Sequence, residues 1–599
     1  MNYQQKNHNF IAQGSILAMT GILCRLIGML YRIPLIDVIG TRGNGYYTSA
    51  YSIYNILLVL SSYSLPTAIS KVISVRLAEE RYDDIRTTLR VAFLYSTLMG
   101  GLMCSLMFFG AGPIAAWMNK PFCAYALRTL APTVWIMAYL GVLRGYFQGS
   151  GNMVPTAVSQ ILEQVINAVV SIVMAVLLFD YGSKANLLYA ETEFSYAYGA
   201  AGGTIGTGAG ALVALLFFLL MMLLYGRMPS GNGYFFREAA ADEIEEVFSK
   251  GQRGAPRKPR SRAKKSVAGN SVEQYIPNRG GTIPRESAGQ VAGVLLVTLL
   301  PILLSSTVYN ISTVLDDFIF SRAMGAFGMA GTVVFLWGVF GEYRILFNIP
   351  VAMANSLSSS VIPSLTNAVA SRNRALVVQK VKLSQHFVML ISIPAAVGLF
   401  VLAEPICDLL FFNEDNQLLV QVLRRGTPAI VLFSLSTITN GILQGLGHLS
   451  EPLRNALIAL VIHVGALAGF LFIEHDIHAV IYANTVFALV VCVLNSRCMH
   501  RHVQYRLSIR KVFGVPILAS AVMGGAVWLV SRMLLTLSRG EGMMGKASLA
   551  VVILLCVGLA VLVYFPMLII LHAFRKDELL EMPMGMRLYK VLHRIGMME

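Results

Sequence analysis

Long apolar runs recur along the whole chain, and short polar segments separate them. A helix of about twenty apolar residues crosses a hydrocarbon core of roughly 30 Å. Backbone groups in lipid must be paired internally, and the runs are continuous rather than alternating, so they predict a helix bundle and not a barrel. We expect an all-α polytopic protein of about fourteen spans, at residues 10–38, 46–75, 88–112, 122–147, 153–180, 199–225, 290–321, 329–365, 382–404, 420–446, 453–474, 477–496, 511–535 and 547–573.

The connecting segments alternate in charge. Basic residues concentrate on one side, in segments 76–90, 226–289, 372–382, 497–511 and 575–594, while the other side holds few of them and the acidic loop 404–415. Because cytoplasmic loops carry an excess of lysine and arginine, both termini are predicted to be cytoplasmic. The protein is expected in the cell membrane, with its first span retained rather than cleaved as a signal peptide.

Composition agrees with the apolar pattern. The 599 residues are 56% hydrophobic and 13% charged, whereas a soluble domain has about 25% charged residues. The net charge of +16 lies in the connecting segments, so we attribute it to membrane topology and expect no nucleic-acid partner. The basic stretch 253–266, RGAPRKPRSRAKKS, predicts a disordered linker that is either simply solvated or binds lipid headgroups or a partner.

The chain repeats itself. GYFQGSGNMVP (145–155) resembles GILQGLGHLSEP (441–452), GTRG (40–43) resembles GAFG (325–328), and Pro66 and Pro350 occupy matching spans as predicted hinges. Repeats of six spans enter the membrane from the same side, which predicts two six-helix lobes related by a pseudo-two-fold axis along the membrane normal. The predicted parts are an N-terminal lobe (1–225), a linker (226–289), a C-terminal lobe (290–500), two additional helices (501–573) and a tail (574–599).

Charged groups deep in a membrane are candidates for function. In the first span, Gly14, Gly21, Arg25, Gly28 and Arg32 fall on one helical stripe, with Arg25 roughly 22 Å from the cytoplasmic end. The glycines, with Gly28 as a hinge candidate, predict close approach of another helix, and the arginines predict an anion site. The alternative is a structural ion pair between Arg25 and Glu163.

Further cations extend this hypothesis. Lys71 and Arg144 lie toward the cytoplasmic ends of their spans, where they either guide a phosphate group or simply anchor the helices. Arg344 and the nearby Glu342 are close enough to satisfy each other's charge, and Arg344 is also a candidate to face the predicted cavity.

The second half offers carboxylates instead. Asp316 and Asp317 are candidates for coupling to H⁺ or Na⁺, or they form a structural salt bridge with Arg322 near a helix end. His386 and His463 are interpreted as packed histidines or as proton relays.

Other signals are weaker. Tyr47, Tyr51, Tyr54 and Asn55 line one face of the second span, as either a sugar-stacking surface or an interfacial tyrosine belt. The sequence shows no nucleotide-binding loop, no nucleophile motif and no metal-ligand spacing, and its seven cysteines are scattered. We therefore predict no catalytic residues, no metal site, no cofactor and no enzyme activity.

The block RLIGMLYRIPLIDVIGTRGNGYYTSAYSIYNILLVLSSYSLPTAISKVIS (25–74), followed by GYFQGSGNMVP, resembles the polysaccharide-biosynthesis or stage V sporulation protein B-like transporters. These are relatives of the lipid II flippases and the MATE exporters, in the MOP superfamily. The resemblance implies two lobes around a central cavity, two additional helices and alternating access. It also implies essential arginines in the first span, matching Arg25-Leu26-Ile27-Gly28.

The preferred function is a flippase that moves an undecaprenyl-diphosphate-linked oligosaccharide or peptidoglycan precursor to the outer leaflet, in envelope or spore-wall biosynthesis. The predicted diphosphate ligands are Arg25, Arg32, Lys71, Arg144 and Arg344. Expected partners are this lipid-linked anionic sugar and membrane lipids, and the protein is expected to be a monomer. The alternatives are a MATE-like exporter of drugs or cations and a non-transporting scaffold for envelope assembly.

Overall fold

The computed structural model describes residues 17, 19–79, 81–226, 286–411, 416–448, 450–505, 508–537, 542–571 and 573, and the regular elements within them are helices. The predicted linker 227–285 and the tail from residue 574 lie outside the described residues. The helices are α2 (Arg32–Leu58), η1 (Val59–Tyr63), α3 (Leu65–Ala78), α4 (Tyr82–Tyr95), η2 (Ser96–Gly100), α5 (Gly101–Trp117), α6 (Cys123–Gly149), α7 (Val154–Tyr189), α8 (Glu193–Gly226), α10 (Ala288–Ala326), η3 (Ala330–Thr332), α11 (Val333–Ala370), α12 (Arg374–Val401), α13 (Ala403–Leu410), α14 (Gln417–Gly445), α15 (Ser450–Glu474), α16 (His478–Val503), η4 (Arg510–Gly514), α17 (Val515–Leu537) and α18 (Gly542–Ile570).

The chain is a multi-pass membrane protein. Twelve helices among the described residues are long and apolar enough to cross a bilayer, and shorter apolar helices cover Met19–Leu30 and the start of α10. Each predicted span overlaps one of these helices, because a run of apolar residues without interior breakers satisfies its backbone only as a helix. The prediction of an all-α polytopic fold is confirmed.

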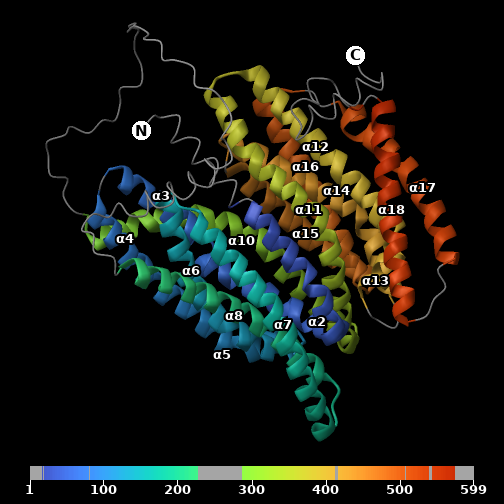
Figure 1. The fold of residues 1–599 in the computed structure, drawn as a ribbon, viewed down its shortest axis with the longest axis horizontal. Helices are drawn as coiled ribbons and strands as arrows, with labels where there is room; N and C mark the ends of the chain where they lie inside the picture. The colour runs from blue at the N-terminus through green and yellow to red at the C-terminus, as the bar shows by residue number, and fades with distance from the viewer. Residues whose placement is uncertain are drawn as a thin grey trace, which may run out of the picture.

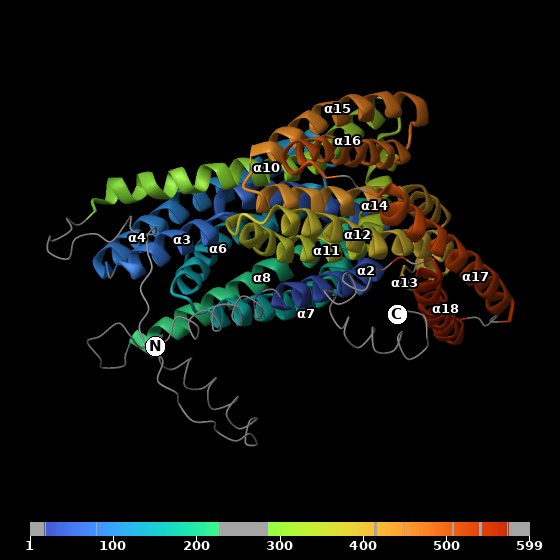
Figure 2. The ribbon, with the colours of Figure 1, turned by 90° about the horizontal axis from the view of Figure 1, so that it is seen from above.

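The helices gather in two groups (Figure 1). Helices α2–α8 pack on one another around three apolar clusters, and helices α11–α16 pack around others. Helix α2 contacts α11, and α10 contacts both α2 and α15, so these three helices join the groups. Helices α17 and α18 pack together at the edge of the bundle beyond α12, as both views show (Figure 2). The exact domain boundaries remain a prediction.

Two breaks differ in form from the expected kinks. Gly40 adopts φ 66° and ends the first span, because only glycine takes this left-handed conformation without strain. Pro66 follows the five-residue π-helical stretch η1 and lies in the first turn of α3, where its missing N–H leaves no hydrogen bond unmade. The second predicted span is therefore interrupted rather than merely bent.

The repeated G-x-x-Q-G-x-G motif forms the same turn twice. Gly151 has φ 85° and Gly447 has φ 89°, and each N–H donates to the carbonyl of the motif's glutamine at 3.0 Å. These turns end α6 and α14 with a left-handed glycine, as helix ends commonly do. The other pair of similar motifs, GTRG and GAFG, does not adopt the same conformation. The glycine with positive φ is Gly40, the first residue, in GTRG, but Gly328, the last residue, in GAFG.

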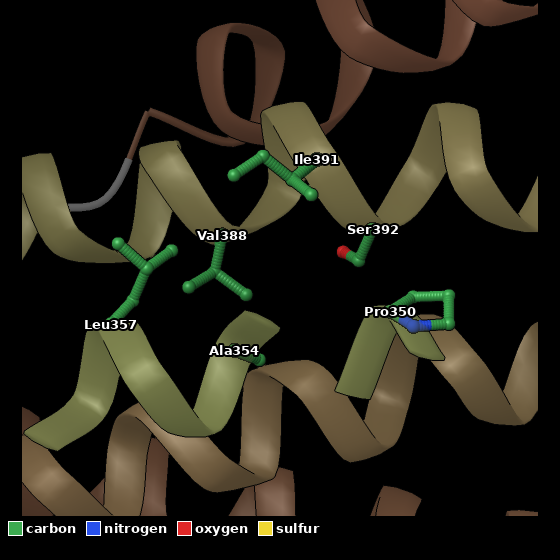
Figure 3. A pocket seen from close by; sticks show the side chains of 6 residues that line it. All are labelled: Pro350, Ala354, Leu357, Val388, Ile391 and Ser392. Atoms are coloured by element: carbon green, nitrogen blue, oxygen red, sulfur yellow. The ribbon is translucent and has the colours of Figure 1, made fainter. Parts of the chain in front are cut away.

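Pro350 lies inside α11, where it borders a small apolar cavity against α12 (Figure 3). The space is about 150 Å³ when the part open to the surroundings is counted, it has no room for a water molecule, and its other walls are Ala354, Leu357, Val388, Ile391 and Ser392. The role of Pro350 as a hinge remains a prediction.

Candidate functional site

A polar cavity lies where α2, α10 and α11 meet, between the two groups of helices. Together with its opening it has a volume of about 620 Å³. The described residues that line it include two arginines and no carboxylate. They are Arg32, Asn44, Tyr47, Thr48, Tyr51, Ser52, Asn55, Asn310, Thr313, Gly341, Arg344, Ile345 and Asn348. Its lining has the charge of an anion site, while the enclosed part of the cavity is only about 90 Å³, smaller than a typical small-molecule site of about 300–1,000 Å³.

Arg32 is held in this cavity by aromatic rings. Its guanidinium carbon lies 5.6 Å from the ring centre of Tyr47 and 5.5 Å from that of Tyr51. The Tyr47 hydroxyl lies 3.1 Å from that of Tyr31, which accepts a hydrogen bond of 3.3 Å from Asn167. Such cation–π contacts attract a guanidinium without using its N–H donors; one donor of Arg32 hydrogen-bonds to the Tyr31 hydroxyl, which leaves other N–H groups that can bind an anion.

Arg344 reaches the same cavity from α11. Its guanidinium carbon lies 5.9 Å from the ring centre of Phe340. It feels repulsion from Arg32 and attraction from Asp316, so the two guanidinium groups act on a shared volume. Arg344 lines the cavity, and Glu342, two residues before it on α11, is fully buried.

The other predicted cations lie elsewhere. Arg25 and Lys71 are exposed on the surfaces of their helices, outside the lining of the cavity. Arg144 donates to the carboxylate of Glu163 at 2.7 Å and to Ser159 at 3.2 Å. The proposed pairing of Glu163 with Arg25 is therefore wrong, because the carboxylate pairs with the buried arginine on the adjacent helix α6 instead.

The described glycines of the first-span stripe, Gly21 and Gly28, are also not in close contact with another helix. A Cβ added at Gly28 would meet its nearest neighbour, Gln164, at an ordinary 3.5 Å, and one added at Gly21 would meet nothing within 4 Å. The close contacts occur instead on α6, where Cβ atoms at Gly145 and Gly149 would lie 2.8 Å from atoms of α3.

Asp316 is buried in a polar cluster of the second group of helices. Its carboxylate lies 2.5 Å from Nε2 of His463 on α15 and accepts a hydrogen bond of 3.0 Å from Asn484 on α16. Nδ1 of His463 lies 2.9 Å from the carbonyl oxygen of Ala483. His463 is thus hydrogen-bonded to Asp316, a predicted coupling residue. This contact could not be predicted because the two residues lie far apart in the sequence.

Asp317 faces the other group of helices. Its carboxylate forms an ion pair with Lys120, and both side chains are fully buried. The Lys120 ammonium also donates to Ser49 at 2.8 Å and lies 4.8 Å from the ring centre of Trp337. The predicted salt bridge to Arg322 is wrong, because that side chain is exposed and Asp317 meets a lysine from the loop before α6.

Helices α2 and α11 touch backbone to backbone near this ion pair. The amide of Asn44 donates to the carbonyl of Gly338 at 2.9 Å. A Cβ at Gly45 would lie 2.1 Å from the carbonyl oxygen of Val334, and one at Gly338 would lie 1.9 Å from that of Thr41. The two groups of helices are therefore closed against each other on the predicted outer side of the cavity.

The residues Tyr47, Tyr51, Tyr54 and Asn55, predicted to share one helix face, do not all line the cavity. Tyr47 and Tyr51 line the cavity with their rings 4.6 Å apart, and Asn55 lines it as well. Tyr54 is buried in the apolar core of the first group. His386 is buried within α12 and does not line the cavity.

Comparisons with known proteins agree with this architecture. Residues 10–228 match the family described as "Polysaccharide biosynthesis protein", and residues 301–467 match the family MatE. The chain is 24% identical over 593 residues to the uncharacterized membrane protein YabM of Bacillus subtilis, covering 98% of each chain. It is 23% identical to lipid II flippase MurJ of the same organism, covering 92% of this chain and 93% of that protein. It is 22% identical to stage V sporulation protein B, also of B. subtilis, covering 76% of this chain and 77% of the relative.

Solved structures share the fold. An inward closed conformation of lipid II flippase MurJ superposes with a TM-score of 0.60 at 14% identity, covering 93% of this chain and 98% of that one. An inward-facing MATE family transporter of the MOP superfamily superposes with a TM-score of 0.57 at 16% identity, covering 81% and 98%. The resemblance expected from residues 25–74 is thus confirmed: one part of the chain matches the polysaccharide biosynthesis protein family and another matches MatE, and the chain is similar to MurJ, to stage V sporulation protein B and, in fold, to a MATE transporter.

Proposed function

We propose that this protein is a flippase for an undecaprenyl-diphosphate-linked oligosaccharide or peptidoglycan precursor. It carries the headgroup from the cytoplasmic to the outer leaflet by alternating access, as a monomer with both termini in the cytoplasm. It acts as a transporter and not as an enzyme.

The proposal depends on one observation, the pair of arginines in a cavity whose described lining has no carboxylate. A diphosphate carries several anionic oxygens, and a planar guanidinium donates to two of them at once. Tyr47 and Tyr51 present aromatic rings beside Arg32, on which a sugar can stack. Arg32 and Arg344 are therefore the proposed diphosphate ligands, while Arg25, Lys71 and Arg144 are proposed to act earlier, along the approach of the headgroup.

The alternatives fit the cavity less well. A MATE-like exporter of organic cations needs negative charge in the cavity, and the described lining has the opposite sign. A scaffold without transport needs no polar volume between the lobes. Among the described residues, Arg32 interacts with neutral rings and forms no ion pair with a carboxylate, which also argues against a purely structural ion pair.

Transport requires the lobes to part on the outer side. That motion breaks the contact of α2 with α11 and the buried Lys120–Asp317 ion pair. We propose that Asp317 belongs to this closure, and that Asp316 with His463 and Asn484 is the site that couples closure to an ion gradient. An imidazole against a carboxylate favours H⁺ over Na⁺ as the coupling ion, since the histidine itself binds the proton.

Reconstituted flipping tests the proposal directly. The full chain is placed in proteoliposomes with a labelled undecaprenyl-diphosphate-linked sugar, and the initial rate of its appearance in the opposite leaflet is measured. Arg32→Ala and Arg344→Ala are each expected to lower the rate about tenfold or more, because a charge-assisted hydrogen bond contributes about 1.5–3 kcal/mol.

Arg322→Ala is the matched control, since Arg322 is exposed on α10 away from the cavity. Unchanged flipping by a well-folded Arg32→Ala/Arg344→Ala double variant would contradict the proposed binding site. Failure of the wild-type protein to move any diphosphate-linked sugar would contradict the substrate class.

A further inference from the structure

Three metal-ligating side chains meet at one end of the C-terminal lobe, far along the chain from the predicted transport residues. They are His448, which follows the glycine turn after α14, Glu451 in the first turn of α15, and His502 near the end of α16. One ligand atom of each lies within 4.8 Å of the others. The spacing in sequence predicted no metal site, because His502 is more than fifty residues from the other two ligands.

The internal repeat shows that this cluster is an addition to a common turn. The turns at Gly151 and Gly447 have the same backbone conformation, and the following residue is Asn152 in the first half and His448 in the second. Three residues further, the first half has Pro155 and the second has Glu451. The turn therefore forms without a histidine or a carboxylate at these positions.

The ligands are partly organised already. Nε2 of His502 lies 2.9 Å from Oε1 of Glu451, while Oε2 of Glu451 is buried and receives no N–H or O–H hydrogen bond from the described residues; the thiol of Cys498, a weak donor, is the further partner of this carboxylate. A buried carboxylate oxygen without a strong donor costs free energy unless a cation reaches it. Cys498 lies beside Glu451 and accepts a hydrogen bond of 3.5 Å from Asn455, so the floor of the cluster is packed.

The imidazole rings indicate what kind of cation fits. His448 and His502 stack with their ring centres 3.7 Å apart and their planes at 22°. Each imidazole has a ring nitrogen that, in the neutral tautomer, offers a lone pair to a metal, and the stack brings two such rings to one place. The side chain of His502 is 26% exposed, so an ion can enter from solvent.

We propose that His448, Glu451 and His502 bind a divalent transition metal of the Zn²⁺ type. Two imidazoles and one carboxylate are ligands that zinc accepts, at about 2.0–2.2 Å each. Tetrahedral bonds of that length hold the ligand atoms about 3.3 Å apart, so a side-chain movement of about 1–2 Å from the present arrangement is enough. Such an ion joins the α14–α15 turn to the end of α16 and fixes this end of the lobe, on the predicted cytoplasmic side. The proposal does not depend on the transported substrate.

Metal binding to the full chain tests this inference without any transport assay. The protein is purified through a tag that contains no histidine and is titrated with Zn²⁺ against a chromogenic chelator. One ion per chain is expected, and Co²⁺ in its place is expected to show the visible absorption of a tetrahedral site. His448→Ala, His502→Ala and Glu451→Gln are each expected to weaken binding about tenfold or more, since even second-shell changes cost 10–100-fold.

His500→Ala is the matched control, because His500 lies on the same helix two residues away and faces the carbonyl of Tyr505 at 3.1 Å. Its affinity for Zn²⁺ is expected to equal that of the wild type. Glu451→Gln keeps the shape of the side chain, so a loss of Zn²⁺ binding in this variant is not explained by unfolding. Absence of stoichiometric binding, or binding that survives the His448→Ala/His502→Ala double change, would overturn the proposal.

Discussion

Lys120 and Asp317 form the most completely buried ion pair among the described residues, and they belong to different groups of helices. Replacing only one partner leaves a charge in a site that excludes water. Lys120→Met is expected to destabilise the protein by about 3–5 kcal/mol, the usual cost of breaking a buried pair. The thermal unfolding of the purified protein in detergent measures this loss.

A double-mutant cycle separates the pair from its surroundings. Lys120→Met combined with Asp317→Asn should recover most of the lost stability, because no uncompensated charge remains. Arg42→Ala serves as a comparison, since its pair with Glu193 is partly exposed, and it is expected to cost at most about 1 kcal/mol. A Lys120→Met variant as stable as the wild type would show that the pair does not hold the lobes.

Asp316 makes a second prediction at the scale of single residues. Its contact with His463 joins a carboxylate to a side chain that binds a proton near neutral pH. Asp316→Asn and His463→Gln are expected to keep the fold but to remove the dependence of flipping on an imposed pH gradient. Flipping rates with and without the gradient, at constant Na⁺, distinguish this outcome. A response to pH that persists in both variants, or a response to Na⁺ alone, would refute proton coupling at this site.

At the scale of helices, the glycines at the crossing of α2 and α11 have a clear mechanical role. Any side chain at Gly45 or Gly338 collides with a backbone carbonyl of the other helix, which cannot move independently of its helix. Gly338→Ala is expected to push the outer ends of α2 and α11 apart and to speed amide exchange there. Hydrogen exchange by mass spectrometry measures this change.

Gly398→Ala is the matched control, because it makes the same substitution in α12 where an added Cβ meets nothing within 4 Å. Amide exchange in this variant should remain that of the wild type. If Gly338→Ala also leaves exchange at the outer ends unchanged, the crossing is not a gate.

The helices could be predicted from the sequence, but many of their contacts could not. Apolar runs determine where a span lies, because lipid leaves the backbone no other solution. The glycine turns at 151 and 447 were also visible as a repeated motif. In contrast, the partners of Glu163, Asp317 and His463 come from helices chosen by packing, which a single sequence does not encode in its spacing.

The candidate site was predictable in part for the same reason. Arg32 and Arg344 could be proposed from the cost of placing charge in a membrane, and both line the cavity. Arg25 satisfies the same rule yet is exposed, since helical periodicity gives the direction of a side chain but not which neighbour covers it. Lys120 was overlooked because a lone lysine near a helix start is ordinarily a surface residue.

At the scale of the whole molecule, the two lobes are expected to stay together without a continuous chain. Helix α2 packs on α11, and α10 contacts α3 and α4, where Arg81 donates to Glu286 at 2.8 Å. Cutting the chain at a protease site inserted within residues 253–266 should therefore leave both halves copurifying and active in flipping. Size-exclusion chromatography and the flipping assay after cleavage test this prediction. Separation of the fragments would show that residues 226–289 hold the lobes together and do not only connect them.

The glycine crossing between α2 and α11 also matters for the energy supply of the cell. Where two backbones meet directly, as at Gly45 and Gly338, the helices leave no room even for a methyl group between them, and such a contact hinders the passage of water. A protein that carries bulky lipid headgroups needs a wide passage, and an imperfect seal in the resting state would let protons leak and discharge the membrane potential. The tight closure allows a protein with such a passage to reside in an energised membrane without dissipating the membrane potential.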